Sequence, residues 1–167
     1  MKRMLAAAAL AFGLGVCGPS AAQDNSAHFL QAPISDATVD SVMNGVMRAL
    51  PHARGPNGPL PPLTDAERAH LLDRDLVREV IDIGAASGVG QACGLDWQRN
   101  NFLPMMARER ARGDRSDHQL AAIAIAHGLI QQQIASAGQC GDSGAAAVND
   151  FYHRKWGVAT TLTAPTP

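Results

Sequence analysis

The stretch GQACGLDWQR brings Cys93, Asp96 and Trp97 within five positions of one another. A cysteine in such a place can be a nucleophile, a metal ligand or one half of a disulfide. A cysteine nucleophile needs a base and a group that orients that base, and a structural zinc ion needs four Cys or His ligands. No histidine pair stands near Cys93 in the sequence. We therefore predict that Cys93 has a structural rather than a chemical role.

The first residues indicate where the chain is sent. Two basic residues precede an apolar run over residues 4–16, which is shorter than the about 20 residues needed to cross a bilayer. Small residues then follow at 20–22, a pattern typical of a secretory signal peptide. We predict that residues 1–22 are removed, that the mature protein starts at Gln23, and that it is periplasmic. An uncleaved membrane anchor is the alternative.

Removal of the signal peptide would leave two cysteines, Cys93 and Cys140. Disulfides form and persist in oxidising compartments, so we predict that these two cysteines pair with each other. A disulfide that closes a loop of this length is worth on the order of 4 kcal/mol in the chain-entropy model.

His127 is a second candidate for chemistry, because it stands in the middle of an apolar stripe. It could ligate the metal of a cofactor, hydrogen-bond a partner, or be a core histidine that bonds a backbone carbonyl. Burial lowers the pKa of a histidine unless a partner compensates. His118 stands nine residues earlier, too far along a helix to share a metal ion with it. One hypothesis places a hydrolase-like site at Asp96, His118 and His127, but no nucleophile with a base stands at a recognisable spacing.

Several motifs typical of catalysis or of cofactor binding are absent from residues 23–167: HExxH, CxxCH, GxGxxG, a P-loop and GxSxG. We therefore expect no metal and no cofactor. The 14 Lys and Arg residues against 15 Asp and Glu residues give a formal net charge of −1, which does not favour binding to nucleic acid. No later apolar run approaches spanning length, so we expect at most a peripheral association with membranes.

The distribution of apolar residues predicts an all-α fold. They repeat at helical spacing, and aromatic residues make up only 4% of the chain. We expect a compact bundle of five to six short helices over residues 35–156, held by one disulfide. A polar lead-in (23–34) precedes this domain, and a disordered tail (157–167) follows it.

Helix ends can be placed from capping residues. The first helix is expected to begin at 35–36 and to end at Pro51. The sequences at 64–67 and 116–119 have the pattern of capping boxes, so a helix is expected to begin at each of them.

The middle of the chain should contain two further helical segments. One begins near Asp73, and we expect the glycines of GAASGVG (84–90) to end it. The next has Asp96 or Asn101 as its cap. We expect its RERAR sequence (108–112) to form a face exposed to solvent.

The stretch PHARGPNGPLPPL, residues 51–63, contains five prolines and should be irregular. Such a segment either binds something or is a solvated linker. Proline-rich backbone loses less conformational entropy on ordering, which favours binding. We predict a partner-binding surface formed by Leu60 and Leu63 together with Met43 and Met47 of the first helix. The apolar stripe of that helix could instead pack only in its own core.

Two stretches, CGLDWQRNNFLPMM and DRSDHQLAAIAIAHGLIQQQI, together with LTDAERAHLLDRDL, resemble segments of a known family. This family is the small third subunit of membrane-bound quinohaemoprotein alcohol dehydrogenases and related small secreted helical proteins of proteobacteria. The resemblance runs from about Leu63 to Ile134. It implies a subunit that supports assembly, because the quinone and haem chemistry of such enzymes belongs to other subunits.

Three hypotheses for function follow from these features. The first is a non-catalytic periplasmic helical protein that binds another periplasmic protein, in one form as an accessory subunit of a respiratory dehydrogenase. The second is a periplasmic inhibitor or immunity protein, which also needs only a stapled scaffold with exposed loops. The third is the small hydrolase-like enzyme described above.

Overall fold

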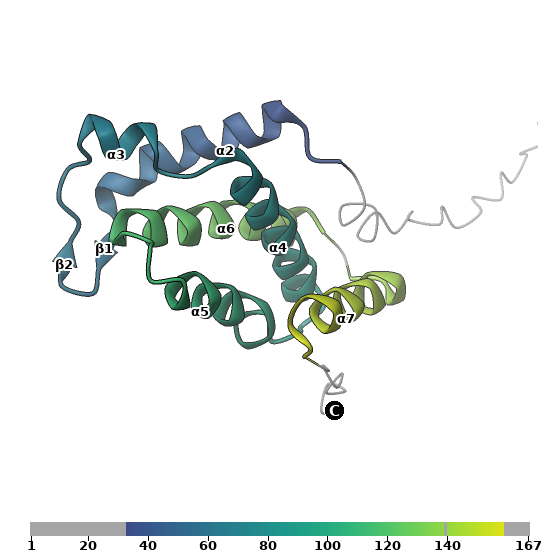
Figure 1. Cartoon of the computed structure of the whole chain (residues 1–167). Helices are drawn as coiled ribbons and strands as arrows, with labels where there is room; N and C mark the ends of the chain where they lie inside the picture. Colours follow the sequence, from purple (N-terminus) through teal and green to yellow (C-terminus); the bar gives the residue numbers. More distant parts are fainter. Residues whose placement is uncertain (1–32, 139, 159–167) are drawn as a thin grey trace, which may run out of the picture.

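The computed structural model describes residues 33–138 and 140–158, which form an all-α fold, as predicted (Figure 1). The predicted signal peptide, most of the lead-in and most of the tail lie outside the described residues. In chain order, the elements are α2 (Asp36–Ala49), a 3₁₀ turn (Leu50–His52), β1 (Arg54–Gly55), β2 (Gly58–Pro59), α3 (Asp65–Ala69), α4 (Arg74–Ala92), a π-helical turn (Gln98–Phe102), α5 (Leu103–Ala111), α6 (Asp117–Ala137) and α7 (Asp142–Trp156).

Side-chain caps begin four of these helices at the places that the sequence predicts. Ser35 caps α2 by accepting a hydrogen bond from a backbone N–H, and Asp73 caps α4 in the same way. Reciprocal capping boxes at 64–67 and 116–119 begin α3 and α6. Each cap satisfies backbone N–H groups that have no partner inside the helix and is worth about 1 kcal/mol.

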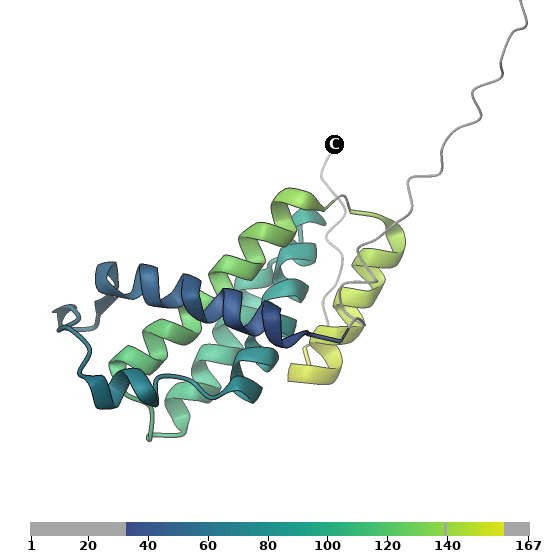
Figure 2. The same cartoon turned by 90° about the horizontal axis from the view of Figure 1, so that it is seen from above.

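The long helices α4 and α6 pack against each other at the centre of the fold, and α2 crosses over both of them (Figure 2). Apolar side chains from α2, α4, α5, α6 and α7 form one continuous core between them. Within the described residues, no helix is both long enough and apolar enough to span a membrane.

The prediction that the glycines at 84–90 end a helix is wrong, because α4 runs through all of them. Their lack of a side chain allows α6 to lie close to α4. A Cβ on Gly88 would lie 2.6 Å from the Cβ of Ile134, and one on Gly84 would lie 2.9 Å from the backbone oxygen of His127. Glycine costs about 1 kcal/mol in a helix, and close packing of the two central helices offsets this cost.

Two residues before α5 were predicted as alternative caps, and the structure shows that only one of them acts as a cap. The Asp96 carboxylate accepts a hydrogen bond from the backbone N–H of Arg99 and therefore acts as a cap. Asn101 is fully buried within the π-helical turn and caps nothing, so that alternative is wrong. Pro104 is the second residue of α5 and has no backbone N–H to donate to the π-helical turn that precedes it.

The proline-rich segment 51–63 is more regular than predicted. After the 3₁₀ turn, β1 and β2 pair as a small antiparallel hairpin. Gly58 in this hairpin has a φ of 123°, a conformation that residues with a side chain rarely adopt. The hairpin reverses the chain, and residues 60–63 then lie beside the end of α2, where both line one hollow.

Candidate functional site

Cys93 and Cys140 form a disulfide, as predicted, with their Cα atoms 4.7 Å apart. Cys93 lies at the end of α4, and Cys140 lies in the connection between α6 and α7. The bond therefore holds the end of one central helix against the connection that leaves the other. A disulfide-bonded Cys93 is neither a thiolate nucleophile nor a metal ligand.

A network of polar side chains runs through the core from α6 to α7. His127 Nε2 lies 2.9 Å from Ser87 Oγ. Asn101 Nδ2 donates to Ser87 Oγ at 2.8 Å and to the backbone oxygen of Ile83 at 2.7 Å. Asn101 Oδ1 in turn accepts from Trp156 Nε1 at 2.6 Å. We call Ser87, Asn101, His127 and Trp156 the polar core network.

Burial sets the charge of His127, because desolvation disfavours the charged form and lowers the pKa of the imidazole to about 4. The Ser87 oxygen accepts a hydrogen bond from Asn101 and has a second lone pair as well as a hydrogen. It can therefore donate to His127 Nε2 or accept from it, so the contact fits either neutral tautomer of the ring. The imidazole is thus neutral near pH 7.

A serine beside a neutral histidine is also the pair that activates a nucleophile in hydrolases. Here the pair is closed to solvent, since Ser87 is 0% exposed and His127 is 1% exposed. The rings of Trp97 and Phe102 lie with their centres 5.8 Å and 4.9 Å from that of His127. A substrate cannot reach Ser87 Oγ in this arrangement, so the pair holds the core together.

The three residues of the hydrolase hypothesis have no partner in common. Asp96 caps a helical turn, His118 contacts Pro61 and Glu67, and His127 belongs to the polar core network. Within the part of the chain that the structure describes, no group of three or more His, Cys, Asp or Glu side chains could hold a metal ion. Sequence reasoning did not connect Ser87, Asn101 and Trp156 with one another, because the distances between them along the chain follow no motif.

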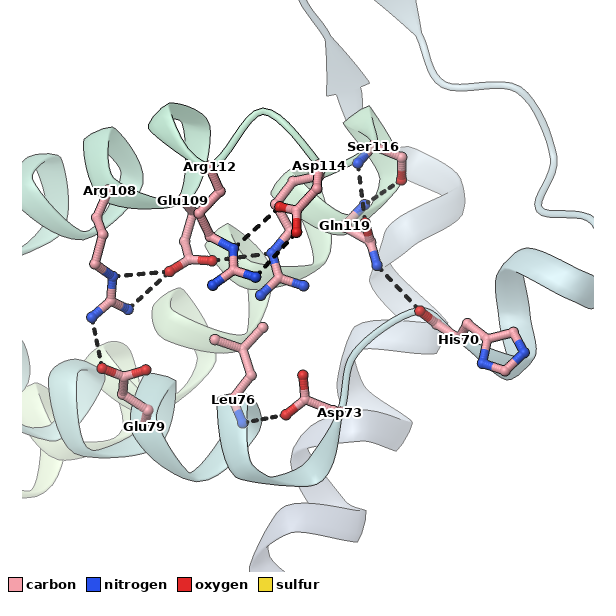
Figure 3. Close-up of polar contacts among 11 residues, drawn as sticks. His70, Asp73, Leu76, Glu79, Arg108, Glu109, Arg112, Asp114, Ser116 and Gln119 are labelled. Carbon is pink, nitrogen blue, oxygen red and sulfur yellow. Dashed lines mark hydrogen bonds and ion pairs between the residues drawn. The ribbon is translucent and has the colours of Figure 1, made fainter.

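A second polar cluster joins α5 to its neighbours (Figure 3). Glu109 is only 2% exposed, so the prediction of a solvent-exposed face is wrong at this residue. Its carboxylate accepts from Arg108 Nε at 2.9 Å and from Arg115 Nε at 3.1 Å. Arg108 also donates to Glu79 of α4 at 2.7 Å, and Lys155 of α7 reaches the same oxygen at 2.5 Å.

The charges of this cluster compensate one another. Partial burial raises the pKa of Glu79, but hydrogen bonds from Arg108 and Lys155 outweigh that effect and bring the pKa below its usual value. The buried Glu109 and the half-buried Glu79 thus both have cationic partners. The cluster ties α4, α5 and α7 together.

An apolar hollow of about 220 Å³ lies between the end of α2, residues 60–63 and α3. We call it the α2–α3 hollow. Its apolar lining consists of Met47, Leu50, Leu60, Leu63 and three prolines, Pro51, Pro61 and Pro62. Prolines restrict the backbone on which they lie, so much of this wall is stiff before anything binds.

Two basic side chains complete the lining of the α2–α3 hollow, Arg68 from α3 and His118 from α6. Among the residues that the structure describes, Arg68 has no hydrogen-bond or ion-pair partner for its guanidinium. His118, by contrast, is held on both sides, by the backbone oxygen of Pro61 and by the carboxylate of Glu67. Within the described part of the chain, the hollow therefore combines an apolar lining with the guanidinium of Arg68, which no described carboxylate neutralises.

Three of the four residues predicted to bind a partner line this hollow: Met47, Leu60 and Leu63. Met43 is partly buried against the core and is not part of the lining. Sequence reasoning missed Arg68 and His118 at this place. The only signal for them was the capping box that begins α3, which does not reveal which surface the helix meets.

The chain was compared with protein-family models, with curated proteins and with solved structures, and none of the three comparisons found a match.

Proposed function

We propose that this protein is a non-catalytic periplasmic binding protein. Its α2–α3 hollow receives one aliphatic side chain of a partner protein, next to a carboxylate of that partner. The observation that carries this proposal is the combination of an apolar hollow with the unpaired guanidinium of Arg68. The disulfide supports a periplasmic location, because such bonds persist in oxidising compartments.

The size of the hollow favours an anchoring side chain over a free ligand. Pockets for drug-sized molecules have volumes of about 300–1,000 Å³, whereas this hollow has about 220 Å³. Protein interfaces commonly place one large side chain of the partner in such a pocket, and this side chain contributes much of the binding energy. The three prolines in the wall reduce the entropy lost when the partner docks.

The charge of the hollow favours an acidic partner. Arg68 is always charged, and no carboxylate of the described residues neutralises it. Its neighbour Glu67 is occupied by Thr64 and His118. A carboxylate from outside can therefore bind the guanidinium through two parallel hydrogen bonds. The accessory-subunit role implied by the family resemblance is a narrower form of this proposal.

A selection from a displayed library of random heptapeptides tests the proposal. We expect enriched peptides to carry Leu, Ile or Met next to Asp or Glu. These peptides should shift the methyl NMR signals of Met47, Leu60 and Leu63. Arg68→Ala should weaken their binding at least tenfold, because the charge-assisted pair is lost.

The matched control is Arg99→Ala, which removes another exposed arginine without a described side-chain partner, away from the hollow. This control should leave binding unchanged. Enrichment of basic peptides, binding that shifts methyl signals elsewhere, or no enrichment at all would overturn the proposal.

A further inference from the structure

His118 connects three elements around the α2–α3 hollow. It lies in the first turn of α6 and is 6% exposed. Its Nε2 lies 2.8 Å from the backbone oxygen of Pro61, in the wall of the hollow. Its Nδ1 lies 3.2 Å from Glu67 Oε1, on the helix that carries Arg68. One imidazole thus joins both walls of the hollow to α6.

Both partners of His118 can only accept hydrogen bonds. The Pro61 oxygen is a backbone carbonyl, which has no hydrogen to donate. The second carboxylate oxygen of Glu67 accepts from the backbone N–H and from the hydroxyl of Thr64, each at 2.8 Å. These hydrogen bonds and the nearby His118 lower the pKa of Glu67, so its carboxylate is ionised.

A neutral imidazole has one N–H group and one lone pair, whereas an imidazolium has two N–H groups. The neutral ring can therefore satisfy either Pro61 or Glu67, but not both. Its other nitrogen would present a lone pair to an acceptor, which is repulsive. Both observed contacts exist together only in the protonated form of His118.

We propose that His118 is a proton-controlled latch on the α2–α3 hollow. With the proton bound, the latch holds residues 60–63 and α3 against α6, and the hollow is formed. When the proton leaves, one of these two connections is lost and the wall loosens. The value of the latch for binding rests on the proposed function, whereas the latch itself is a property of the isolated protein.

Few titratable or charged side chains lie near His118 among the described residues. The titratable or charged side chains that share a hollow with it are Glu67 and Arg68 of α3 and His70, which directly follows α3, and Asp117 precedes it on α6. Residues 60–63 and the part of α2 that lines the hollow contribute no titratable side chain. Histidines ordinarily titrate between pH 5 and 8, so His70 is the neighbour that must be controlled for.

NMR of the isolated protein between pH 5.5 and pH 8 tests the latch directly. We expect both ring nitrogens of His118 to be protonated at the acidic end and one of them to lose its proton as the pH rises. The methyl signals of Leu60 and Leu63 should shift with the same midpoint. Methyl signals that stay constant while His118 titrates, or a ring with one N–H throughout, would overturn the proposal.

The variant Glu67→Gln provides the most specific test. A glutamine at this position still accepts from Thr64, so the capping box and α3 are retained. Its amide N–H₂ can donate to a neutral Nδ1, so the neutral form of His118 can then keep both contacts. The pH response of the Leu60 and Leu63 methyl signals should disappear in this variant. His70→Asn should leave that response intact, and a response that survives Glu67→Gln but not His70→Asn would assign it to His70.

Peptide binding separates failure of the latch from failure of the proposed function. The affinity for the acidic peptides described above should fall about tenfold from pH 5.5 to pH 8, since a hydrogen bond to a charged group is lost. Methyl signals that follow the proton, without any peptide binding, would support the latch and refute the proposed function. Peptides that bind equally at both pH values would refute the latch alone.

Discussion

The two buried histidines of α6 lie in regions that treat the same side chain in opposite ways. His127 belongs to the polar core network, where its partner is a hydroxyl, which can donate as well as accept. His118 lies beside the α2–α3 hollow, where both of its partners are acceptors. The core therefore suits a neutral imidazole, whereas the latch proposed at the edge of the hollow needs a second N–H group on the ring. Burial favours the neutral form of a histidine, and the hydrogen-bonding capacity of its neighbours can favour the other form.

The two regions also differ in whether their polar side chains have hydrogen-bond partners. Three members of the polar core network, Ser87, Asn101 and His127, are buried, and its hydrogen bonds run between elements of the fold. The hollow leaves the guanidinium of Arg68 without a partner among the described residues. Satisfied polar groups stabilise a fold, whereas an unsatisfied group at an open apolar hollow is available to a partner. Changes to the two regions should therefore have different consequences.

The largest effect on stability should come from the disulfide, which secures the end of α4. Cys93→Ser should lower the free energy of unfolding by about 4 kcal/mol, because the unfolded chain regains the entropy of an open loop. Chemical denaturation measures this loss, and reduction of the native protein should reproduce it. Binding of acidic peptides at the hollow should persist below the unfolding transition. Alkylation of Cys93 or Cys140 in the unreduced native protein would contradict the disulfide.

The next effect concerns the acid sensitivity of the core. The pKa of His127 is about 4 in the folded protein, against an ordinary value of 6.5. As the pH falls from 6.5 towards 4, the unfolded state binds a proton at this residue and the folded state does not. His127 should therefore destabilise the fold progressively over this range, by on the order of 3 kcal/mol at pH 4.

Denaturation curves at a series of pH values measure this dependence, and His127→Asn should remove it. The exposed His153 offers the matched control, because His153→Asn should leave the dependence unchanged. The hypothesis fails if the native protein and the His127→Asn variant lose stability equally between pH 6.5 and pH 4.

A smaller effect should follow from opening the polar core network at its centre. Asn101→Ala removes the acceptor of Trp156 Nε1 and one hydrogen bond of Ser87, which should cost about 2 kcal/mol. Thermal unfolding monitored by tryptophan fluorescence measures this cost. Asn100→Ala is the matched control, because that side chain has no described hydrogen bond, and it should cost much less. Equal stability of the two variants would show that the network does not hold the core together.

Local sequence was sufficient to predict the helices and many of their ends. The caps at Ser35 and Asp73 and the capping boxes at 64–67 and 116–119 act between residues three positions apart. Such interactions are complete within one turn of a helix, so the sequence contains all the information they need. The disulfide was predictable for a different reason, because removal of the predicted signal peptide would leave two cysteines and therefore one pairing.

The errors have a common cause. The glycines at 84–90 were expected to end a helix, but α6 lies against them, and packing of α4 on α6 outweighs their low helix propensity. Asn101 and Glu109 are polar residues that local patterns place at a cap and on a solvent face. Each is instead buried and hydrogen-bonded. The partners of Asn101 lie on α4 and α7, far from it along the chain, and no local pattern indicates that Glu109 is buried.

The sequence by itself determined the class of fold, several helix caps and the disulfide pairing. Only the tertiary structure decided which polar residues meet. Ser87 and His127 stand 40 positions apart, and His118 and Pro61 stand 57 positions apart. The protonation of a histidine depends on its burial and on the atoms within about 3 Å of its ring nitrogens, and the folding of distant segments determines both.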